Sequence, residues 1–139
     1  MSQEKIIYCA DAIALYEDTK KLVIIERLGN IPGLALPGGK QESGETLSYT
    51  VVREMLEETG LSFEYSDVLG AYGEPGRDPR GKYISVVFIG TARGVVRDES
   101  AKTRVHLFGL DELGVMLDRF VFDHGKILSD FMTSNLYKK

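Results

Sequence analysis

Hydrophobic and polar positions along the chain first predict two antiparallel strands. Residues 6–16 and 21–28 are rich in β-branched and aromatic residues, and the polar stretch EDTKK between them is typical of a hairpin. Four glycines and two prolines in residues 29–39 then predict irregular chain. A helical pattern follows, with Thr46 expected as the N-cap and Gly60 as the residue that ends the helix.

The second half of the chain adds more strands and helices. We expect strands at residues 63–73, 83–92 and 103–110, a loop at 74–82, and helices at 111–117 and 123–139. The last helix has apolar residues spaced to form one face: Ile127, Leu128, Phe131 and Met132. Because strands and helices do not alternate regularly, we predict an α/β fold in which a mixed sheet lies between helices, formed by residues 1–139 as a single domain.

The composition restricts the partners that we expect. The chain has 139 residues and 43% hydrophobic content, enough for one core. A net charge of -4 disfavours duplex nucleic acid, and no apolar run is long enough to cross a membrane. The single cysteine, Cys9, excludes an internal disulfide and suits a reducing cytoplasm. A small phosphorylated substrate is compatible with an acidic protein when a divalent metal neutralises the site.

Three glutamates share one face of the predicted helix. With Glu54 taken as zero on a helical wheel, Glu57 falls at about -60° and Glu58 at about +40°. Like charges at these spacings repel one another, which predicts a cation beside them. Because Mg²⁺ and Mn²⁺ prefer oxygen ligands, we expect one of these ions. A solvated acidic face is the alternative interpretation of the glutamates alone.

Neighbouring residues complete this predicted site. The opposite face of the helix is expected to pack on the sheet and hold the glutamates outward through Val52, Met55, Leu56 and Thr59. A tight loop in which backbone groups approach the same metal or a phosphate is allowed by Gly38, Gly39 and Gly44. Arg53 lies beside the glutamates, where we expect it to fix the rotamer of Glu45 or Glu57.

The spacing of these residues resembles a known signature. From Gly39 the order is glycine, five residues, Glu45, seven residues, Arg53, Glu54, Met55, one residue, Glu57, Glu58, one residue, Gly60, Leu61. This 23-residue pattern resembles that of the Nudix hydrolase family, in which Ile, Leu or Val usually stands at Met55. LALPGG at 34–39 and FDHGKIL at 122–128 extend the resemblance, although Leu34 stands where a tryptophan is common.

The resemblance implies a fold, a reaction and roles for individual residues. The fold is an α/β/α sandwich, and the reaction is hydrolysis of a nucleoside diphosphate linked to another group. The metal ligands would be Glu54, Glu57 and Glu58, with Arg53 and Glu45 as organising residues. A bound metal would activate the attacking water and stabilise the leaving phosphate.

The loop after the third strand indicates the substrate. Two arginines, Arg77 and Arg80, lie in a stretch stiffened by proline and glycine, where they suit phosphate binding or an ion pair with Asp78. The sequence PGRDPRG resembles small ADP-ribose pyrophosphatases, of which Pro75 is a mark. This resemblance implies cleavage of ADP-ribose to AMP and ribose 5-phosphate. A MutT-like nucleoside triphosphate pyrophosphohydrolase and an ADP-ribose sensor with little turnover are the alternatives.

Other residues have several possible roles. The general base is a glutamate of the signature or a loop carboxylate, with Glu99, Glu74 and Asp78 as the loop candidates. Arg27 is a further candidate for phosphate binding. A structural role is expected for His106, and His124 is expected to cap or orient the last helix. Tyr8, Tyr72 and Tyr83 are candidates for stacking on adenine, with a place in the core as the alternative. The resemblance also implies a homodimer, because relatives with this loop often dimerise.

Overall fold

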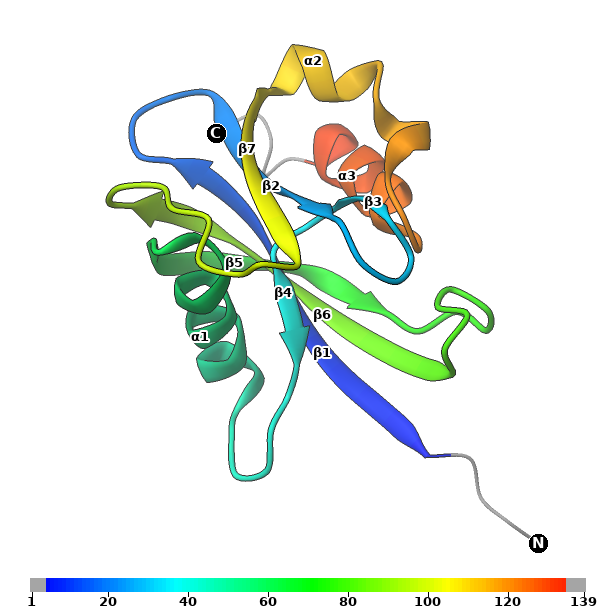
Figure 1. The fold of residues 1–139 in the computed structure, drawn as a ribbon. Helices are drawn as coiled ribbons and strands as arrows, with labels where there is room; N and C mark the ends of the chain where they lie inside the picture. Colours follow the sequence, from blue (N-terminus) through cyan, green and yellow to red (C-terminus); the bar gives the residue numbers. More distant parts are fainter. Residues whose placement is uncertain (1–4, 135–139) are drawn as a thin grey trace, which may run out of the picture.

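The computed structural model describes residues 5–134, which form a mixed sheet between helices (Figure 1). The elements, in chain order, are β1 (Ile6–Tyr16), β2 (Lys21–Arg27), β3 (Gly33–Ala35), β4 (Gly38–Lys40), α1 (Leu47–Thr59), β5 (Ser62–Tyr72), β6 (Lys82–Arg93), β7 (Thr103–Gly109), α2 (Leu110–Gly114), η1 (Leu117–Arg119) and α3 (His124–Thr133). The predicted mixed α/β architecture is confirmed.

β1 is the central strand of the sheet. The strand order is β3-β2-β1-β6-β5, with β4 paired to β1 and β7 paired to β2. β1 and β6 run parallel from the pair Ile6 and Lys82 to the pair Tyr16 and Ala92. The predicted hairpin joins β1 and β2 at Leu15 and Leu22, where its antiparallel ladder is short. The ladder is short because the first half of β1 pairs with β4 instead.

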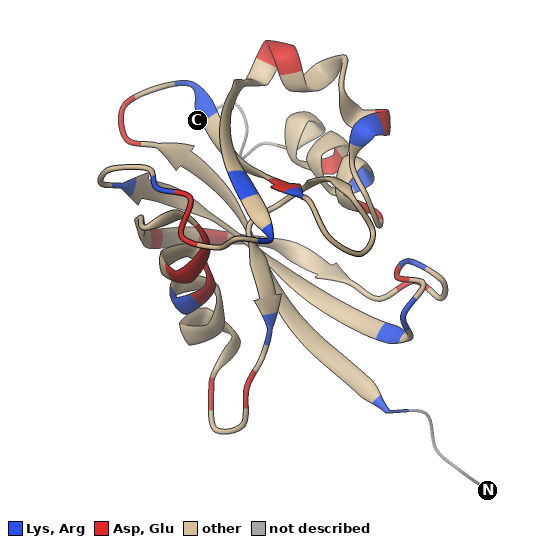
Figure 2. Cartoon of the chain, in the orientation of Figure 1, with Lys and Arg blue, Asp and Glu red and all other residues tan. Residues whose placement is uncertain are grey.

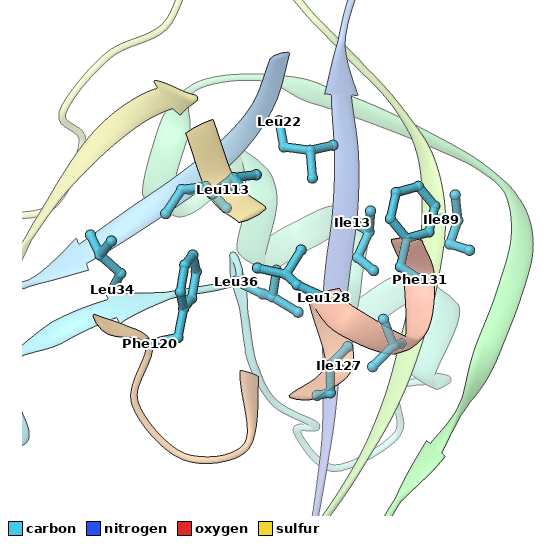
Figure 3. Close-up of a cluster of buried hydrophobic side chains, with 12 residues drawn as sticks. Ile13, Leu22, Leu34, Leu36, Ile89, Leu113, Phe120, Ile127, Leu128 and Phe131 are labelled. Atoms are coloured by element: carbon cyan, nitrogen blue, oxygen red, sulfur yellow. The ribbon is translucent and has the colours of Figure 1, made fainter. Parts of the chain in front are cut away.

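The two faces of the sheet are covered by different helices. α1 packs on β1, β4 and β5, whereas α2, η1 and α3 lie across the sheet on the opposite face (Figure 1). Residues of β1 alternate between these layers, with Ala10, Ala12 and Ala14 toward α1 and Ile13 toward α3. Figure 3 shows the second layer, in which α3 inserts Ile127, Leu128 and Phe131. Burial on both sides fixes the register of β1.

α1 begins and ends where its capping residues predict. The Thr46 hydroxyl accepts a hydrogen bond from the Tyr49 N–H at 3.1 Å. At the other end Gly60 has φ 75°, and its N–H donates to the Leu56 carbonyl at 3.0 Å. Both ends of the helix are therefore determined by local sequence.

The predicted packing face of α1 is partly wrong. Met55 and Thr59 are buried as expected, but Val52 and Leu56 are exposed. The buried side also includes Thr50 and Val51, so the helix is rotated toward its glutamates. This rotation occurs because β4, which packs beside α1, begins with two glycines that leave room for carboxylates.

Three further expectations change in detail. Residues 29–39, expected to be irregular, contain β3 and the first two residues of β4, because their backbones pair with β2 and β1. The helix expected at 111–117 ends at Gly114 and is followed by the 3-10 turn η1. The last helix is α3, and positions 135–139 of its predicted extent lie outside the described residues. Among residues 5–134, no helix is long and apolar enough to cross a membrane.

Candidate active site

A cavity of about 550 Å³ lies where α1, β4, the loop between β5 and β6 and the start of α3 meet. Acidic and basic side chains both line this cavity. The acidic residues are Glu42, Glu54, Glu58, Asp11 and Asp78, and the basic residues are Arg27, Lys40, Arg77 and Arg80. Figure 2 shows acidic positions along α1 and in the loop before it, and basic positions in the loop between β5 and β6. Opposite charges therefore face one shared space.

Glu58 and Glu54 point into the cavity rather than outward, which corrects the expectation for this face. Glu58 Oε1 accepts a hydrogen bond from the Gly38 N–H at 3.0 Å. Burial, together with the negative charges of Glu54 and Asp11, raises the pKa of Glu58 to about 8. Burial also raises the pKa of Glu54. Glu54 and Glu58 are therefore partly buried carboxylates whose charged forms are disfavoured by desolvation.

Gly39 lies directly against Glu54. A Cβ at this position would lie 2.1 Å from Glu54 Oε2, so any side chain here would require the Glu54 carboxylate to move. Gly38 is equally confined, because a Cβ there would lie 2.3 Å from the Ala10 carbonyl oxygen and from Asp11 Oδ1. The two glycines predicted to bring backbone close to a ligand thus bring it close to the carboxylates.

Arg53 links three glutamates and the end of β4. Its Nε donates to Glu45 at 2.5 Å, and its Nη1 donates to Glu54 and Glu57, each at 2.7 Å. Its Nη2 donates to the Lys40 carbonyl at 3.1 Å. The Arg53 guanidinium lowers the pKa of Glu45 to about 2. Arg53 therefore contacts both of the glutamates that sequence reasoning offered as alternatives.

The three expected metal ligands do not converge in this structure. Glu57 is about half exposed, bonded to Arg53 and outside the cavity lining. Within residues 5–134, no three acidic, histidine or cysteine side chains form a ready metal cluster. Glu54, Glu58 and the nearby backbone nevertheless fit a divalent ion, because they offer oxygen donors that line one cavity. Mg²⁺ commonly binds one or two carboxylates and completes its shell with substrate and water.

Three arginines line the basic side, each anchored through the same atoms. Arg77 donates from Nε and Nη2 to Asp123 at 2.8 and 2.6 Å. Arg80 donates from the same atoms to Asp78 at 3.0 and 2.7 Å. Arg27 donates hydrogen bonds from Nε and Nη2 to the backbone carbonyls of residues 31 and 30. The ion pair expected with Asp78 is therefore made by Arg80. Within residues 5–134, the Nη1 atom of each of these three arginines makes no hydrogen bond.

Two aromatic rings contact Arg27, Arg80 and the neighbouring Lys40. The Arg80 guanidinium lies 4.9 Å from the ring centre of Tyr83 and 5.0 Å from that of Phe122. Arg27 lies on the Phe122 ring at 5.2 Å, and Lys40 lies on the Tyr83 ring at 5.7 Å. Cations in such positions are attracted to the ring faces.

Sequence reasoning missed a polar group at the base of the cavity. Asp11 is buried, accepts a hydrogen bond from the Ser85 hydroxyl, and lies 3.7 Å from His124 Nε2. Burial raises the pKa of Asp11 and lowers that of His124. The one signal in the sequence was an aspartate inside an apolar strand, YCADAIALY, where period-two alternation turns it to the same side as Ile13. Thr103, whose buried hydroxyl has no partner, also lines the cavity.

Several candidates from the sequence lie outside the cavity lining. Glu99 is exposed and lies against Gly60, at the end of α1. His106 pairs with Glu26 at 2.8 Å, whereas His124 opens α3 and lines the cavity. Of the three candidate tyrosines, Tyr83 lines the cavity, whereas Tyr8 and Tyr72 do not. Glu74 also lies outside the lining.

An acidic helix that faces anchored arginines across one cavity suits a metal ion and a phosphorylated ligand. The chain belongs to the Nudix family, because the NUDIX domain family model matches residues 8–131. It is 39% identical over 132 residues to a protein of Methanocaldococcus jannaschii named ADP-ribose pyrophosphatase, covering 91% of this chain and 76% of that protein. The predicted family and enzyme class, Nudix hydrolase, are confirmed.

Solved structures share the fold. A bifunctional NMN adenylyltransferase/ADP ribose pyrophosphatase from Francisella tularensis matches 95% of this chain with a TM-score of 0.82 and 20% identity. This chain spans 42% of that protein. The NUDIX domain of Shewanella oneidensis NrtR, solved with ADP ribose, matches 92% of this chain and 87% of its own length, with a TM-score of 0.77 and 23% identity. The predicted α/β/α sandwich is thereby confirmed.

Proposed function

We propose that this Nudix hydrolase cleaves ADP-ribose to AMP and ribose 5-phosphate with the help of a divalent metal. One observation carries the proposal: partly buried glutamates and anchored arginines face the same cavity. A diphosphate joins two sugars in ADP-ribose, so a substrate in this cavity needs both charge neutralisation at the glutamates and cationic contacts beyond them. The relative named ADP-ribose pyrophosphatase supports the choice of substrate.

We propose Mg²⁺ or Mn²⁺ as the cofactor, held by Glu54, Glu58 and backbone oxygen at Gly39, with Glu57 joining them when it leaves Arg53. The bound ion would supply a polarised phosphate and an activated water. Arg53 holds Glu54 and Glu57 and at the same time ties α1 to the Lys40 carbonyl. It thereby keeps the helix and β4 at a fixed separation, which positioned catalysis requires.

The arginines are proposed to bind the substrate. Arg27, Arg77 and Arg80 have two donor atoms fixed by protein acceptors, which leaves Nη1 of each for phosphate or sugar oxygens. A guanidinium that is already oriented loses less entropy when it binds an anion. Gly39 is proposed to bring its backbone to the same ligand.

Two exposed glutamates are proposed as the candidates for the general base. Glu57 lies beside Glu54 and shares its arginine. Glu99 lies at the C-terminal end of the same helix, on the loop between β6 and β7. Each carboxylate would accept a proton from the attacking water once it lies within hydrogen-bond reach.

Rates on a substrate panel test the proposal. We expect kcat/KM for ADP-ribose to exceed that for NADH, diadenosine polyphosphates and oxidised or normal dNTPs. Preferred turnover of dNTPs with release of pyrophosphate would instead favour a MutT-like enzyme. Tight binding of ADP-ribose without turnover of any compound would favour a sensor.

We further propose that the chain acts as a single domain in the cytoplasm and forms a homodimer. The family match over residues 8–131 supports one domain. Light scattering on the purified chain measures the oligomeric state, and a monomeric mass at assay concentration would contradict the dimer.

A further inference from the structure

Three consecutive residues at the start of α3 each hold a different part of the cavity wall. Phe122 contacts two arginines, Asp123 binds a third, and His124 binds the link between β3 and β4. We infer that residues 122–124 form a positioning segment that orients the three arginines for an anionic ligand. The inference rests on the proposed function insofar as that ligand is ADP-ribose.

Phe122 adopts an uncommon backbone conformation to reach this place. Its φ of 58° lies in the left-handed region, which costs free energy for a bulky residue. The ring then contacts both the Arg27 and the Arg80 guanidinium, at 5.2 and 5.0 Å from its centre. Because these two arginines come from β2 and from the loop after β5, no shared element fixes their separation. The Phe122 ring does so.

The Asp123 carboxylate pairs with Arg77 rather than capping helix α3. It occupies the N-cap position of α3, where aspartate usually accepts a hydrogen bond from a backbone N–H of the first turn. The Asp123 side chain makes no such bond and instead binds Arg77 through two hydrogen bonds of 2.8 and 2.6 Å. The Arg77 side chain is almost fully buried, so this bidentate pair fixes its orientation.

His124 anchors the other end of the segment. Its Nδ1 accepts a hydrogen bond of 2.9 Å from the Leu36 N–H, at the point where the chain leaves β3 and enters β4. His124 is buried, and this bond satisfies a buried backbone donor between two strands. The strained Phe122 is therefore held by a bound neighbour, Asp123, and by a buried anchor one residue further on.

This arrangement assigns the segment to ligand binding rather than to the chemical step. Phe122 and Asp123 act through arginines, so their effect on binding must disappear when those arginines are absent. A double-mutant cycle separates such a positioning residue from one that only supports the fold. The same cycle distinguishes a positioning residue from an aromatic ring that stacks directly on the ligand.

Calorimetry in EDTA measures binding of ADP-ribose and, separately, of inorganic diphosphate without turnover. We expect Phe122→Leu to weaken binding by roughly tenfold, the size of two favourable cation–π contacts. In an Arg27→Ala, Arg80→Ala background the same change should weaken binding by less than about twofold. Phe122→Tyr, which keeps the ring, should match the wild-type chain. Phe108→Leu removes a ring that stacks on His106 outside the cavity and serves as the control.

Asp123→Asn gives a second route if Phe122→Leu does not fold, as judged by its melting temperature. Its loss of binding should likewise vanish in an Arg77→Ala background. Equal losses with and without the arginines, or no loss from either variant, would overturn the inference. If the wild-type chain binds diphosphate but not ADP-ribose, the proposed substrate is wrong and the diphosphate cycle decides the inference. Binding of neither compound would contradict both.

Discussion

The Cα of Gly39 lies so close to the Glu54 carboxylate that an added Cβ would lie 2.1 Å from Oε2. A side chain at Gly39 in β4 would therefore require the Glu54 carboxylate of α1 to move. These two elements, β4 and α1, carry the proposed metal ligands.

Gly39→Ala should therefore displace Glu54 while the core stays intact. We expect turnover to fall by roughly 10²-fold, the effect of misplacing a reacting group by about 1 Å. Gly29→Ala is a matched control, because a Cβ at Gly29 meets nothing within 4 Å. Steady-state rates and melting temperatures of both variants check the prediction. Normal turnover by Gly39→Ala would show that this close approach is not required.

Arg53→Lys should impair catalysis because lysine cannot reproduce the branched contacts of arginine. Arg53 binds Glu45, Glu54 and Glu57 and also the Lys40 carbonyl. A lysine ammonium retains the charge but not the fixed fork, so we expect kcat to fall by roughly 10²-fold. Arg93→Lys, at an exposed position, is the matched control and should leave kcat unchanged. An active Arg53→Lys enzyme would indicate that charge alone suffices.

The raised pKa of Glu58 predicts how the stability of the metal-free protein depends on pH. Its folded-state pKa is raised from 4.5 to about 8, so the folded protein keeps a proton that the unfolded chain has lost. The contribution to stability is complete below the unfolded pKa and is lost as pH rises toward the folded pKa. In EDTA the melting temperature should therefore fall between about pH 5 and pH 8.

Two comparisons isolate this effect of Glu58. Glu58→Gln should melt at a temperature that changes less over the same pH range. Mg²⁺ or Mn²⁺ should raise the melting temperature of the wild-type chain more at the upper end of the range, because metal binding requires the deprotonated carboxylate. Parallel melting curves for the wild type and Glu58→Gln would contradict the raised pKa of Glu58.

Glu57→Gln and Glu99→Gln should differ strongly in turnover. Glu57 shares Arg53 with Glu54, so we expect its variant to lose roughly 10²-fold to 10⁴-fold, the range for a positioned acid or base. Glu99 lies against Gly60, outside the cavity lining, and its variant should retain at least about a third of the activity, as a surface carboxylate would. The pH–rate profiles of the two variants check the assignment. A larger loss from Glu99→Gln would make Glu99 the general base.

The features that sequence predicted well depend on local interactions. The ends of α1 follow from Thr46 and Gly60, and β1 and β2 follow from their apolar runs. The spacing within α1 predicted three glutamates on one face, of which Glu54 and Glu58 line the cavity and Glu57 does not. Each of these depends on residues within a few positions of one another, where helix and strand periodicity apply.

The features that sequence missed depend on contacts between distant segments. Asp11 reaches the cavity because β1 lies between β4 and β6, and His124 reaches it because α3 begins at the link between β3 and β4. A helical wheel shows which residues share a face but not which face is buried. For this reason Leu56 was expected inside and is exposed.

Product analysis on ADP-ribose tests the central claim most directly. The purified chain is incubated with ADP-ribose and Mg²⁺, and in parallel with ADP-ribose and EDTA, and the products are separated by chromatography. The account predicts AMP and ribose 5-phosphate in equal amounts with Mg²⁺ and neither product in EDTA. Unchanged ADP-ribose with Mg²⁺, or equal cleavage in EDTA, would contradict it.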